Sequence, residues 1–372
     1  MRAERSEPMR EFLARAGWQD ATLVPLAGDA STRRYMHATR GDRKAMLMDQ
    51  PQGAESPACP PNAKEEERRA LGYNAIARLA GADCARFVAT AEYLRTRGFS
   101  APEIYAADAA QGFVLMEDLG NNLYADIMNA GGDEAALYSA AIDALALLHT
   151  EQAPDILAPD KPLYDYDETA LLAEIDLLTE WFLPMALQRP AQEAEILEHR
   201  ALWRDALCPV LAAPRVFVHR DYHAQNILWL PDREGSRRVG IIDFQDAVGG
   251  SRSYDLVSLL EDARRDVNPD LAEAMTRNYF AAMRTRGQPL DEGQHRAEMA
   301  VLAAQRNAKI VGIFSRLFKR DNKPRYLAYM PRVWNYLNRD LSHPAMAPLK
   351  KWYDRTVPQA YRGELRVEGA TS

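Results

Sequence analysis

The segment 218–246 carries the residues whose types and spacing are best suited to chemistry. It reads VHRDYHAQNILWLPDREGSRRVGIIDFQD, with Asp221 and Asn226 between two short apolar runs and Asp243 at the end of the next run. A β-hairpin would bring these three side chains together at one edge of a sheet. A carboxylate and an amide oxygen are ligands that suit Mg²⁺. The other carboxylate, Asp221, could then accept a proton from a substrate hydroxyl.

The same residues follow the phosphoryl-transfer template of protein kinases. In that template a catalytic-loop Asp meets the acceptor hydroxyl, and a later Asn and Asp hold metal. The triplet His219-Arg220-Asp221, then Asn226, then Asp243 agree with it in type, order and strand context. Gln245 replaces the glycine expected after Asp-Phe. We predict that His219 braces the loop, and the apolar strands around it argue against a zinc pair with His223, which would need a helix.

Composition excludes several other classes of protein. The 372 residues include 46 Lys and Arg against 53 Asp and Glu, a net charge of −7, which argues against nucleic-acid or anionic-membrane partners. Three scattered cysteines predict neither a disulfide framework nor a zinc site. We expect a cytoplasmic protein, because no apolar stretch is long enough to span a membrane and the first residues do not form a signal peptide. We also expect a monomer. The P-loop, dinucleotide and nucleophile-elbow motifs are absent from the sequence.

The first third of the chain is predicted to be rich in β-structure. A short helix at 8–17, closed by Gly17, precedes apolar runs at 22–27, 35–39 and 45–48. Turn residues between these runs predict a small antiparallel sheet. A proline-rich loop then leads into predicted helices at 64–79 and 82–97, followed by an apolar run at 113–116. The charged start of the first helix, KEEERR, is typical of a solvated face.

Helical periodicity dominates from residue 133 onward. It is interrupted by short β-type runs at 216–218, 227–230 and 239–242, and it resumes near residue 254. We therefore expect a β-rich part at 20–117 and a larger helical part with a small embedded sheet.

The chain resembles the aminoglycoside phosphotransferase family, which contains small-molecule kinases. More narrowly, it is similar to the anomeric sugar kinases that phosphorylate N-acetylmuramate and N-acetylglucosamine at C1 in bacterial cell-wall recycling. The resemblance covers residues 10–340 and is carried by the segments 219–232, 237–247, 254–267, 305–317, 28–35 and 47–51. It implies an α+β, bilobal protein-kinase-like fold. Residues 1–117 would form the nucleotide-binding lobe, with an insertion near 52–81, and 118–372 the catalytic and acceptor-binding lobe.

The resemblance also implies roles for individual residues. Asp221 would be the catalytic base, Asn226 and Asp243 the Mg²⁺ ligands, and ATP the phosphoryl donor. Asp255 would anchor the catalytic loop, as a structural residue beside His219. The remaining nucleotide contacts would come from the phosphate loop and from the backbone of the hinge, at Gly28, Asp29, Ser31, Thr32, Arg33, Glu117 and Leu119.

One departure from the family concerns the third strand. Protein kinases place a lysine there to hold the nucleotide phosphates, whereas this strand has Met48 at that position. Lys44 lies upstream on the same side by strand alternation. Arg33 or Arg34 could supply the positive charge instead.

The acceptor is predicted with less detail. Tyr222, His223, Arg306 and Lys309 are candidates to bind the N-acetyl or lactyl groups of a sugar. A lactyl carboxylate would pair with a cation such as Arg306 or Lys309. Two alternatives stay open: an aminoglycoside phosphotransferase, suggested by the acid-rich segment 261–270, and an inactive nucleotide-binding scaffold, suggested by the missing lysine.

Overall fold

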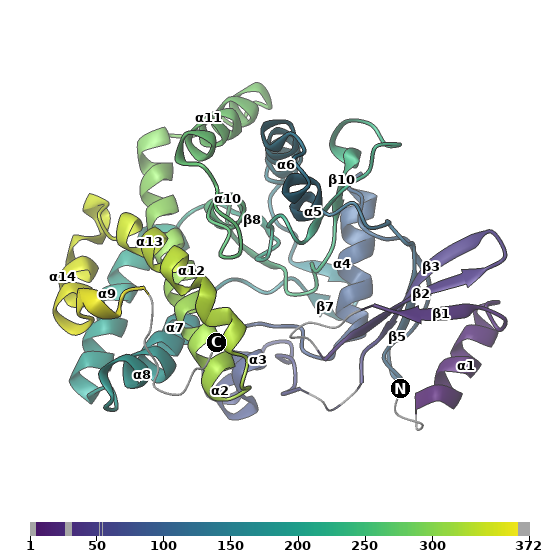
Figure 1. Ribbon diagram of the computed structural model, residues 1–372, viewed down its shortest axis with the longest axis horizontal. Coiled ribbons are helices and arrows are strands. Elements are labelled where there is room, and N and C mark those ends of the chain that lie inside the picture. Colours follow the sequence, from purple (N-terminus) through teal and green to yellow (C-terminus); the bar gives the residue numbers. More distant parts are fainter. Residues whose placement is uncertain (1–4, 27–31, 52, 54, 364–372) are drawn as a thin grey trace. The chain divides into compact units, whose positions relative to one another are not determined.

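A computed structural model of the protein describes residues 5–26, 32–51, 53 and 55–363 (Figure 1). The chain divides into two compact units, each built from three stretches of sequence. Unit 1 contains residues 1–144, 154–164 and 224–248, and unit 2 contains residues 145–153, 165–223 and 249–372. The functional lobes predicted at 1–117 and 118–372, and the insertion near 52–81, stay predictions.

Unit 1 contains a five-stranded antiparallel sheet with the order β1-β2-β3-β5-β4. The sheet confirms the strands predicted from the apolar runs, and it adds β4, an alanine-rich segment that carries little β-propensity. The strands are β1 (Thr22–Pro25), β2 (Arg34–Arg40), β3 (Arg43–Asp49), β4 (Ile104–Asp108) and β5 (Phe113–Met116).

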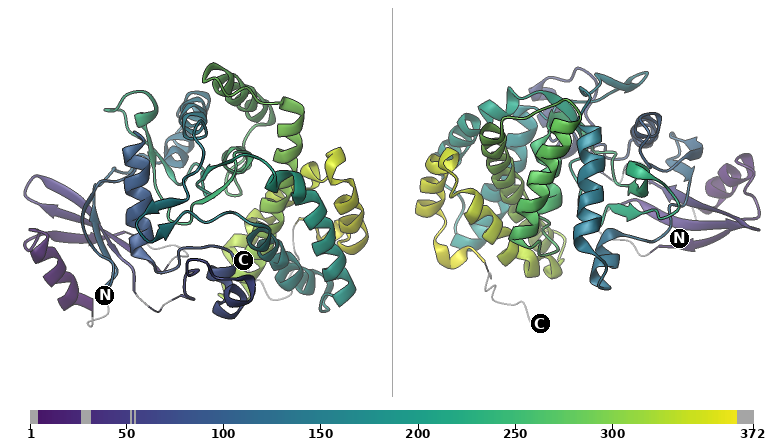
Figure 2. Two further views of the ribbon diagram at one scale, coloured as in Figure 1. Left: turned by 180° about the vertical axis from the view of Figure 1, so that it is seen from behind. Right: turned by 90° about the horizontal axis from the view of Figure 1, so that it is seen from above.

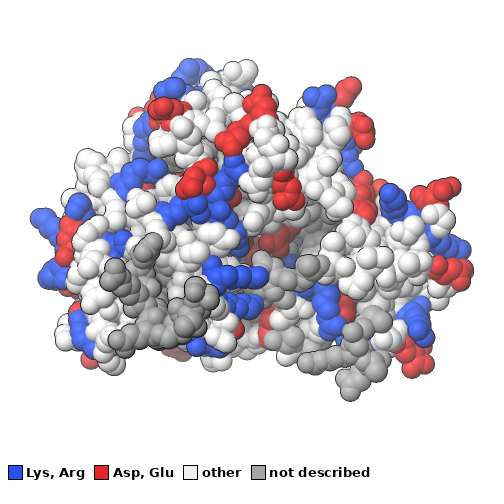
Figure 3. All heavy atoms as spheres, viewed as in Figure 1, with Lys and Arg blue, Asp and Glu red and all other residues white. Residues whose placement is uncertain are grey.

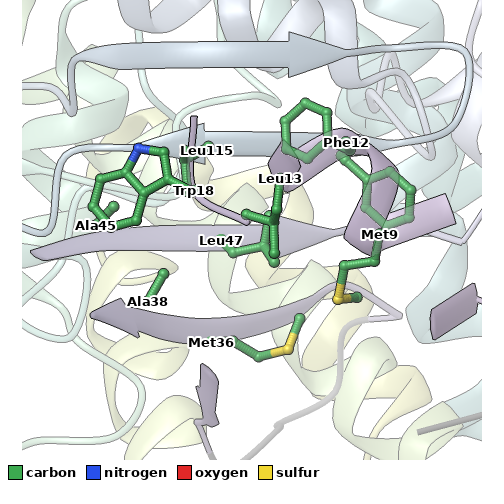
Figure 4. Close-up of a cluster of buried hydrophobic side chains, with 10 residues drawn as sticks. Met9, Phe12, Leu13, Trp18, Met36, Ala38, Ala45, Leu47 and Leu115 are labelled. Carbon is green, nitrogen blue, oxygen red and sulfur yellow. The ribbon is translucent and has the colours of Figure 1, made fainter. Parts of the chain in front are cut away.

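One side of this sheet is covered by the N-terminal helix α1 (Ser6–Arg15) (Figure 1). Figure 4 shows Met9, Phe12 and Leu13 of the helix packed against the sheet, with Trp18 beside them. Strand alternation sends every second residue to this side, and those buried here are Met36, Ala38, Ala45, Leu47, Phe113 and Leu115. The intervening residues, including Tyr35, Met46 and Met48, therefore belong to the opposite side.

The helix predicted at 64–79 is broken in two. Gly72 has φ +101°, which a helix cannot accommodate, and it separates α2 (Glu65–Leu71) from α3 (Tyr73–Ile76). The run KEEERR is mostly exposed as expected, but Arg68 is buried and donates to the Ile76 carbonyl oxygen at 2.5 Å. The other helices of unit 1 are α4 (Cys84–Thr96), α5 (Tyr124–Asn129) and the start of α6 (Glu134–Leu148).

The short strands of the chemistry-bearing segment do not form one embedded sheet. In unit 1, β9 (Ile227–Trp229) and β10 (Val239–Ile241) form an antiparallel hairpin around the short helix η3 (Gly235–Arg238). Strand β8 (Arg215–Val218) instead pairs with β11 (Val248–Ser251). A third two-stranded ladder joins β6 (Ile156–Ala158) to β7 (Lys161–Pro162).

Unit 2 is mainly helical. Its longest helix is α12 (Glu292–Lys319), which packs against α7 (Glu168–Leu177), α9 (Glu193–Leu211), α10 (Ser253–Leu260) and α13 (Met330–Asp340). Figure 2 shows the helices in two further views. The remaining elements are the π-helical turn η2 (Leu178–Phe182), α8 (Leu183–Leu187), α11 (Pro269–Thr285), η4 (Pro324–Tyr329), η5 (Pro344–Met346), α14 (Ala347–Thr356) and η6 (Gln359–Tyr361).

Surface and bonding features agree with the composition. Basic and acidic side chains are interspersed over the face shown in Figure 3. The three cysteines are free, with Cys59 and Cys84 buried and Cys208 exposed. Within the part of the chain that the structure describes, no helix is both long and apolar enough to cross a membrane.

Gly312 allows α12 to approach α7 closely. A Cβ atom at this position would lie 2.4 Å from the carbonyl carbon of Leu177 and 2.7 Å from its oxygen, both of which are backbone atoms. We expect Gly312→Ala to lower the free energy of unfolding by about 1–3 kcal/mol, as overpacking does. Equilibrium urea unfolding would measure the change.

Gly293, in the first turn of the same helix, provides the matched control. The nearest atom to a Cβ there is Asp291 Oδ1 at 3.4 Å. Gly293→Ala should therefore match the wild type or exceed it, because alanine is the better helix former. Equal stability of Gly312→Ala and the wild type would contradict the close approach.

His199 is a buried histidine that must be neutral to fit its surroundings. The indole N–H of Trp203 donates to His199 Nε2 at 2.9 Å, and an indole nitrogen can only donate. The ring also stacks on Trp352, with 4.2 Å between centroids. Burial lowers the pKa of His199 to about 3. Burial likewise lowers the pKa of His295 to about 3.

These depressed pKa values make stability dependent on pH. The unfolded chain takes up a proton near pH 6.5, whereas the folded chain resists protonation until about pH 3. The contribution of the neutral histidine to the free energy of unfolding is therefore fully present above pH 6.5, and it decreases as the pH falls toward 3. We expect wild-type protein to lose roughly 1 kcal/mol per such histidine between pH 7.5 and 5.5. His199→Gln should lose correspondingly less in urea unfolding at the two pH values, and an undiminished loss would contradict this assignment.

Candidate active site

A pocket of about 510 Å³ lies within unit 1. Its walls are largely apolar, which suits a flat heteroaromatic ring. Asn226 and Asp243 supply polar groups to the same pocket. The apolar and aromatic walls include Tyr35, Met46, Phe87, Met116, Leu228 and Ile242.

The β9–β10 hairpin places Asn226 and Asp243 side by side. The hairpin pairing continues past the strands, since the Ile242 N–H donates to the Asn226 carbonyl oxygen at 3.1 Å. Asn226 Nδ2 then lies 3.4 Å from Asp243 Oδ2. Asp243 has φ +62°, a conformation uncommon outside glycine and found more often for Asp and Asn. Gln245 also positions this carboxylate, because its Nε2 donates to Asp243 Oδ1 at 3.0 Å.

The two residues predicted to form the hinge line the same pocket. Glu117 and Leu119 both contribute to its wall. The Glu117 N–H donates to the Glu103 carbonyl oxygen at 2.7 Å, and its carboxylate accepts from Arg233 at 2.5 Å. Hydrogen bonds of both its backbone and its side chain therefore fix the position of Glu117.

Only part of the predicted phosphate loop can be described. Gly28, Asp29 and Ser31 lie outside the described residues. Thr32 donates to Glu55 and accepts from Gln50 Nε2 at 3.1 Å. The side chain of Arg33 is 13% exposed, and its Nη1 lies 3.6 Å from Asp243 Oδ1.

Asp221 belongs to unit 2, on the loop that follows β8. The Asp255 carboxylate accepts the N–H groups of His219 at 2.7 Å and of Arg220 at 2.9 Å. The Asp221 N–H donates to His219 Nδ1 at 3.2 Å. These bonds hold the loop in a strained conformation, since Arg220 has φ +75°.

Glu174 is a buried acid that sequence reasoning missed. It is 1% exposed, forms an ion pair with Arg220, and accepts from Lys309 Nζ at 3.0 Å. Gln305 Nε2 donates to its second oxygen at 3.0 Å. The only signal in the sequence is an acid inside the apolar helical stripe of α7. Glu174 therefore ties the catalytic loop, through Arg220, to α7 and α12.

Cations surround the carboxylate of Asp221. Burial alone would raise the pKa of Asp221, but the positive charges of Lys309, Arg306 and Arg220 help to lower it to about 2. Asp221 is therefore ionised at every pH at which the enzyme would normally be assayed.

The other candidates for acceptor binding are largely buried. Tyr222 is 1% exposed, and its ring contacts that of His219 with 5.8 Å between centroids. Burial lowers the pKa of His223 to about 4, so it is neutral at pH 7. Arg306 Nη1 donates to the Glu261 carbonyl oxygen at 3.1 Å. Whether these residues and Lys309 contact an acceptor stays a prediction.

The sequence model of the phosphotransferase enzyme family matches residues 22–290, well over half of the chain. This chain belongs to that family. It is a small-molecule kinase with the bilobal α+β fold of kinases.

Curated relatives and solved structures agree with this assignment. The chain is 44% identical to the N-acetylmuramate/N-acetylglucosamine kinase of Caulobacter vibrioides, covering 96% of this chain and 98% of the relative. It is 30% identical to the kinase of that name from Pseudomonas aeruginosa, over 91% and 90% of the two chains.

Among solved structures, an ADP-bound aminoglycoside phosphotransferase APH(2'')-Ib has a TM-score of 0.52 at 16% identity, over 91% of this chain and 97% of that one. A microcompartment-associated aminopropanol kinase has a TM-score of 0.58 at 14% identity, over 90% and 98%. At these identities the two structures support the fold alone. They do not identify the substrate of this phosphotransferase.

Proposed function

We propose that this kinase transfers the terminal phosphoryl group of ATP to the anomeric C1 hydroxyl of N-acetylmuramate, N-acetylglucosamine or both, in bacterial cell-wall recycling. The observation that carries the proposal is the cationic setting of Asp221, because Lys309 and Arg306, both positively charged at neutral pH, lower the pKa of its carboxylate to about 2. A base in such surroundings suits an anionic or neutral acceptor. The names of the relatives point to the same two sugars.

The pocket of unit 1 is the proposed nucleotide site. Adenine would lie between its apolar walls, with the backbone of Glu117 and Leu119 at its edge. The phosphates would extend toward Asn226 and Asp243, at the polar part of the pocket lining. The predicted phosphate loop begins before Thr32 and would cover them.

The donor set at Asn226 and Asp243 fits Mg²⁺. Among the residues that the structure describes, no three His, Cys, Asp or Glu side chains are grouped to hold a metal. A single carboxylate with one amide oxygen suits Mg²⁺ because this ion usually keeps water and substrate phosphates as its other ligands. When bound, the ion would neutralise charge on the phosphates. Asp243 is held for this task by Gln245.

Asp221 is the proposed base. It would orient the acceptor hydroxyl and accept its proton. A carboxylate of low pKa is a weak base. Because the anomeric hydroxyl is more acidic than an ordinary alcohol, its deprotonation does not require a strong base. Because phosphoryl transfer passes through a loose transition state, positioning contributes more than base strength.

Two of the four acids of the segment 261–270, Glu261 and Asp266, weaken the aminoglycoside alternative. Glu261 accepts from Arg339 at 2.5 Å and from Asn307 at 2.7 Å. Asp266 accepts from Arg332 at 2.5 Å. These carboxylates are already paired with cations of the chain, whereas binding a polycationic drug requires carboxylates that can turn to the ligand.

The test is ADP release from ATP and Mg²⁺ with four acceptors: N-acetylmuramate, N-acetylglucosamine, glucose and kanamycin. Turnover restricted to the N-acetyl sugars is the expected result, and a product labile to mild acid would place the phosphate on C1. Turnover on kanamycin alone would overturn the proposal in favour of a drug-modifying enzyme. Nucleotide binding without turnover on any acceptor would favour the scaffold.

A further inference from the structure

Arg33 and Arg34 are adjacent in sequence, but their side chains bind different carboxylates. Arg34 begins β2, and its Nε lies 3.9 Å from Asp49 Oδ2, on a carboxylate that Arg5 also binds. Arg33 Nη1 lies 3.6 Å from Asp243 Oδ1. Arg33 immediately precedes β2, and the two contacts show that its side chain points in a different direction from that of Arg34.

Arg33 lies on the side of the sheet that faces the nucleotide pocket. Two residues later on that side comes Tyr35, which lines the pocket. Tyr35 is the cross-strand partner of Met48, the residue that stands where protein kinases have their phosphate-binding lysine. Met48 is 1% exposed and carries no charge. The neighbouring strand therefore supplies a cation next to the position from which the lysine is missing.

Lys44 is a weaker replacement for that lysine. It lies four residues before Met48, a span of roughly 13 Å along a strand. Its cross-strand partner is Thr39, and it lines a hollow that adjoins the nucleotide pocket and shares Asp118 with it, whereas Lys44 itself does not line that pocket. Arg33, in contrast, already reaches the carboxylate proposed to hold the metal.

We propose that Arg33 binds the phosphate chain of the nucleotide, in place of the lysine that this kinase lacks. The proposal rests on the nucleotide site described under the proposed function. Arginine suits the role, because its guanidinium group stays charged and can hold two phosphate oxygens at once. Its side chain is only 13% exposed, compared with 40% for Arg34, so it is partly ordered before the ligand arrives.

Calorimetric titration of the purified full chain tests this without any acceptor. The probes are ADP with Mg²⁺, ADP in EDTA, and adenosine, which has the base but no phosphate. We expect Arg33→Met to weaken ADP binding by ~10- to 100-fold, the usual effect of losing a hydrogen bond to a charged group. The loss should persist in EDTA, and the affinity for adenosine should be unchanged. Arg33→Lys should lose less than Arg33→Met.

Arg34→Met is the matched control, and it should bind all three probes as the wild type does. Wild-type ADP affinity in Arg33→Met would overturn the proposal. So would an equal loss for adenosine, which would mean a damaged pocket, or a loss confined to Mg²⁺, which would mean that Arg33 acts only through Asp243. A wild-type protein that binds neither ADP nor adenosine would overturn the proposed function itself.

Discussion

Asp243→Ala is expected to abolish phosphoryl transfer, with a loss of more than about 10³-fold in kcat. Asp243 is the only carboxylate of the donor pair that it forms with Asn226, and alanine would leave one amide oxygen. It would also remove the partner of Gln245 and of Arg33. Steady-state ADP release at saturating ATP would measure the loss.

The matched control for this prediction is Asp232→Ala. Asp232 lies on the connection between β9 and β10 and is exposed. The control changes the same residue type in the same hairpin, so it should keep wild-type turnover. Thermal unfolding of both variants would verify that they fold. Asp243→Ala with a tenth or more of wild-type activity would refute the role of this carboxylate in holding metal.

Asp221→Asn should lower kcat by ~10²- to 10⁴-fold, the range typical of a lost general base. Asn is nearly isosteric with Asp and can still orient a hydroxyl, so some activity should remain. The affinity for ADP should not change, because Asp221 is not among the residues that line the proposed nucleotide pocket and ADP lacks the phosphoryl group that is transferred. ADP release and ADP titration together separate these two effects.

The pH profile gives an independent check on Asp221. Although burial favours its neutral form, the nearby cations, chiefly Lys309 and Arg306, hold its pKa at about 2. The base is therefore deprotonated throughout the range from pH 5 to 8. Wild-type kcat/KM should show no acidic limb from Asp221 within this range.

Asp266→Asn is a useful control for the Asp221 prediction. Asp266 is exposed, pairs with Arg332 and belongs to the acid-rich segment of unit 2. Its loss should leave turnover on N-acetyl sugars unchanged. Near-wild-type turnover in Asp221→Asn would exclude Asp221 as the base, whatever the behaviour of this control.

Local patterns in the sequence predicted most elements and the core of the site. Apolar runs bounded by turn residues predicted β1, β2, β3 and β5, because such runs and turn residues are local properties of the sequence. The order Asp221, Asn226, Asp243 predicted the chemistry for the same reason. The local pattern failed at Gly72, whose φ of +101° divides the helix predicted at 64–79 into two helices.

The structure corrected or added several points that depend on distant parts of the chain. Strand β8 pairs with β11 and not with the hairpin that follows it in sequence. Glu174 contacts Arg220, 46 residues away, and Lys309, 135 residues away. No local pattern encodes such partners, since the meeting of two helices and a loop is decided only when the whole unit packs.

By itself, the sequence indicated phosphoryl transfer, because the types and order of Asp221, Asn226 and Asp243 are local properties of the chain. It also predicted that Arg33 contacts the nucleotide, but it left open whether Arg33 or Arg34 supplies the missing positive charge. Only the tertiary structure distinguished them. Arg33 contacts Asp243, which lines the pocket, whereas Arg34, the first residue of β2, contacts Asp49, and such contacts between distant residues form only when the sheet and the hairpin pack together.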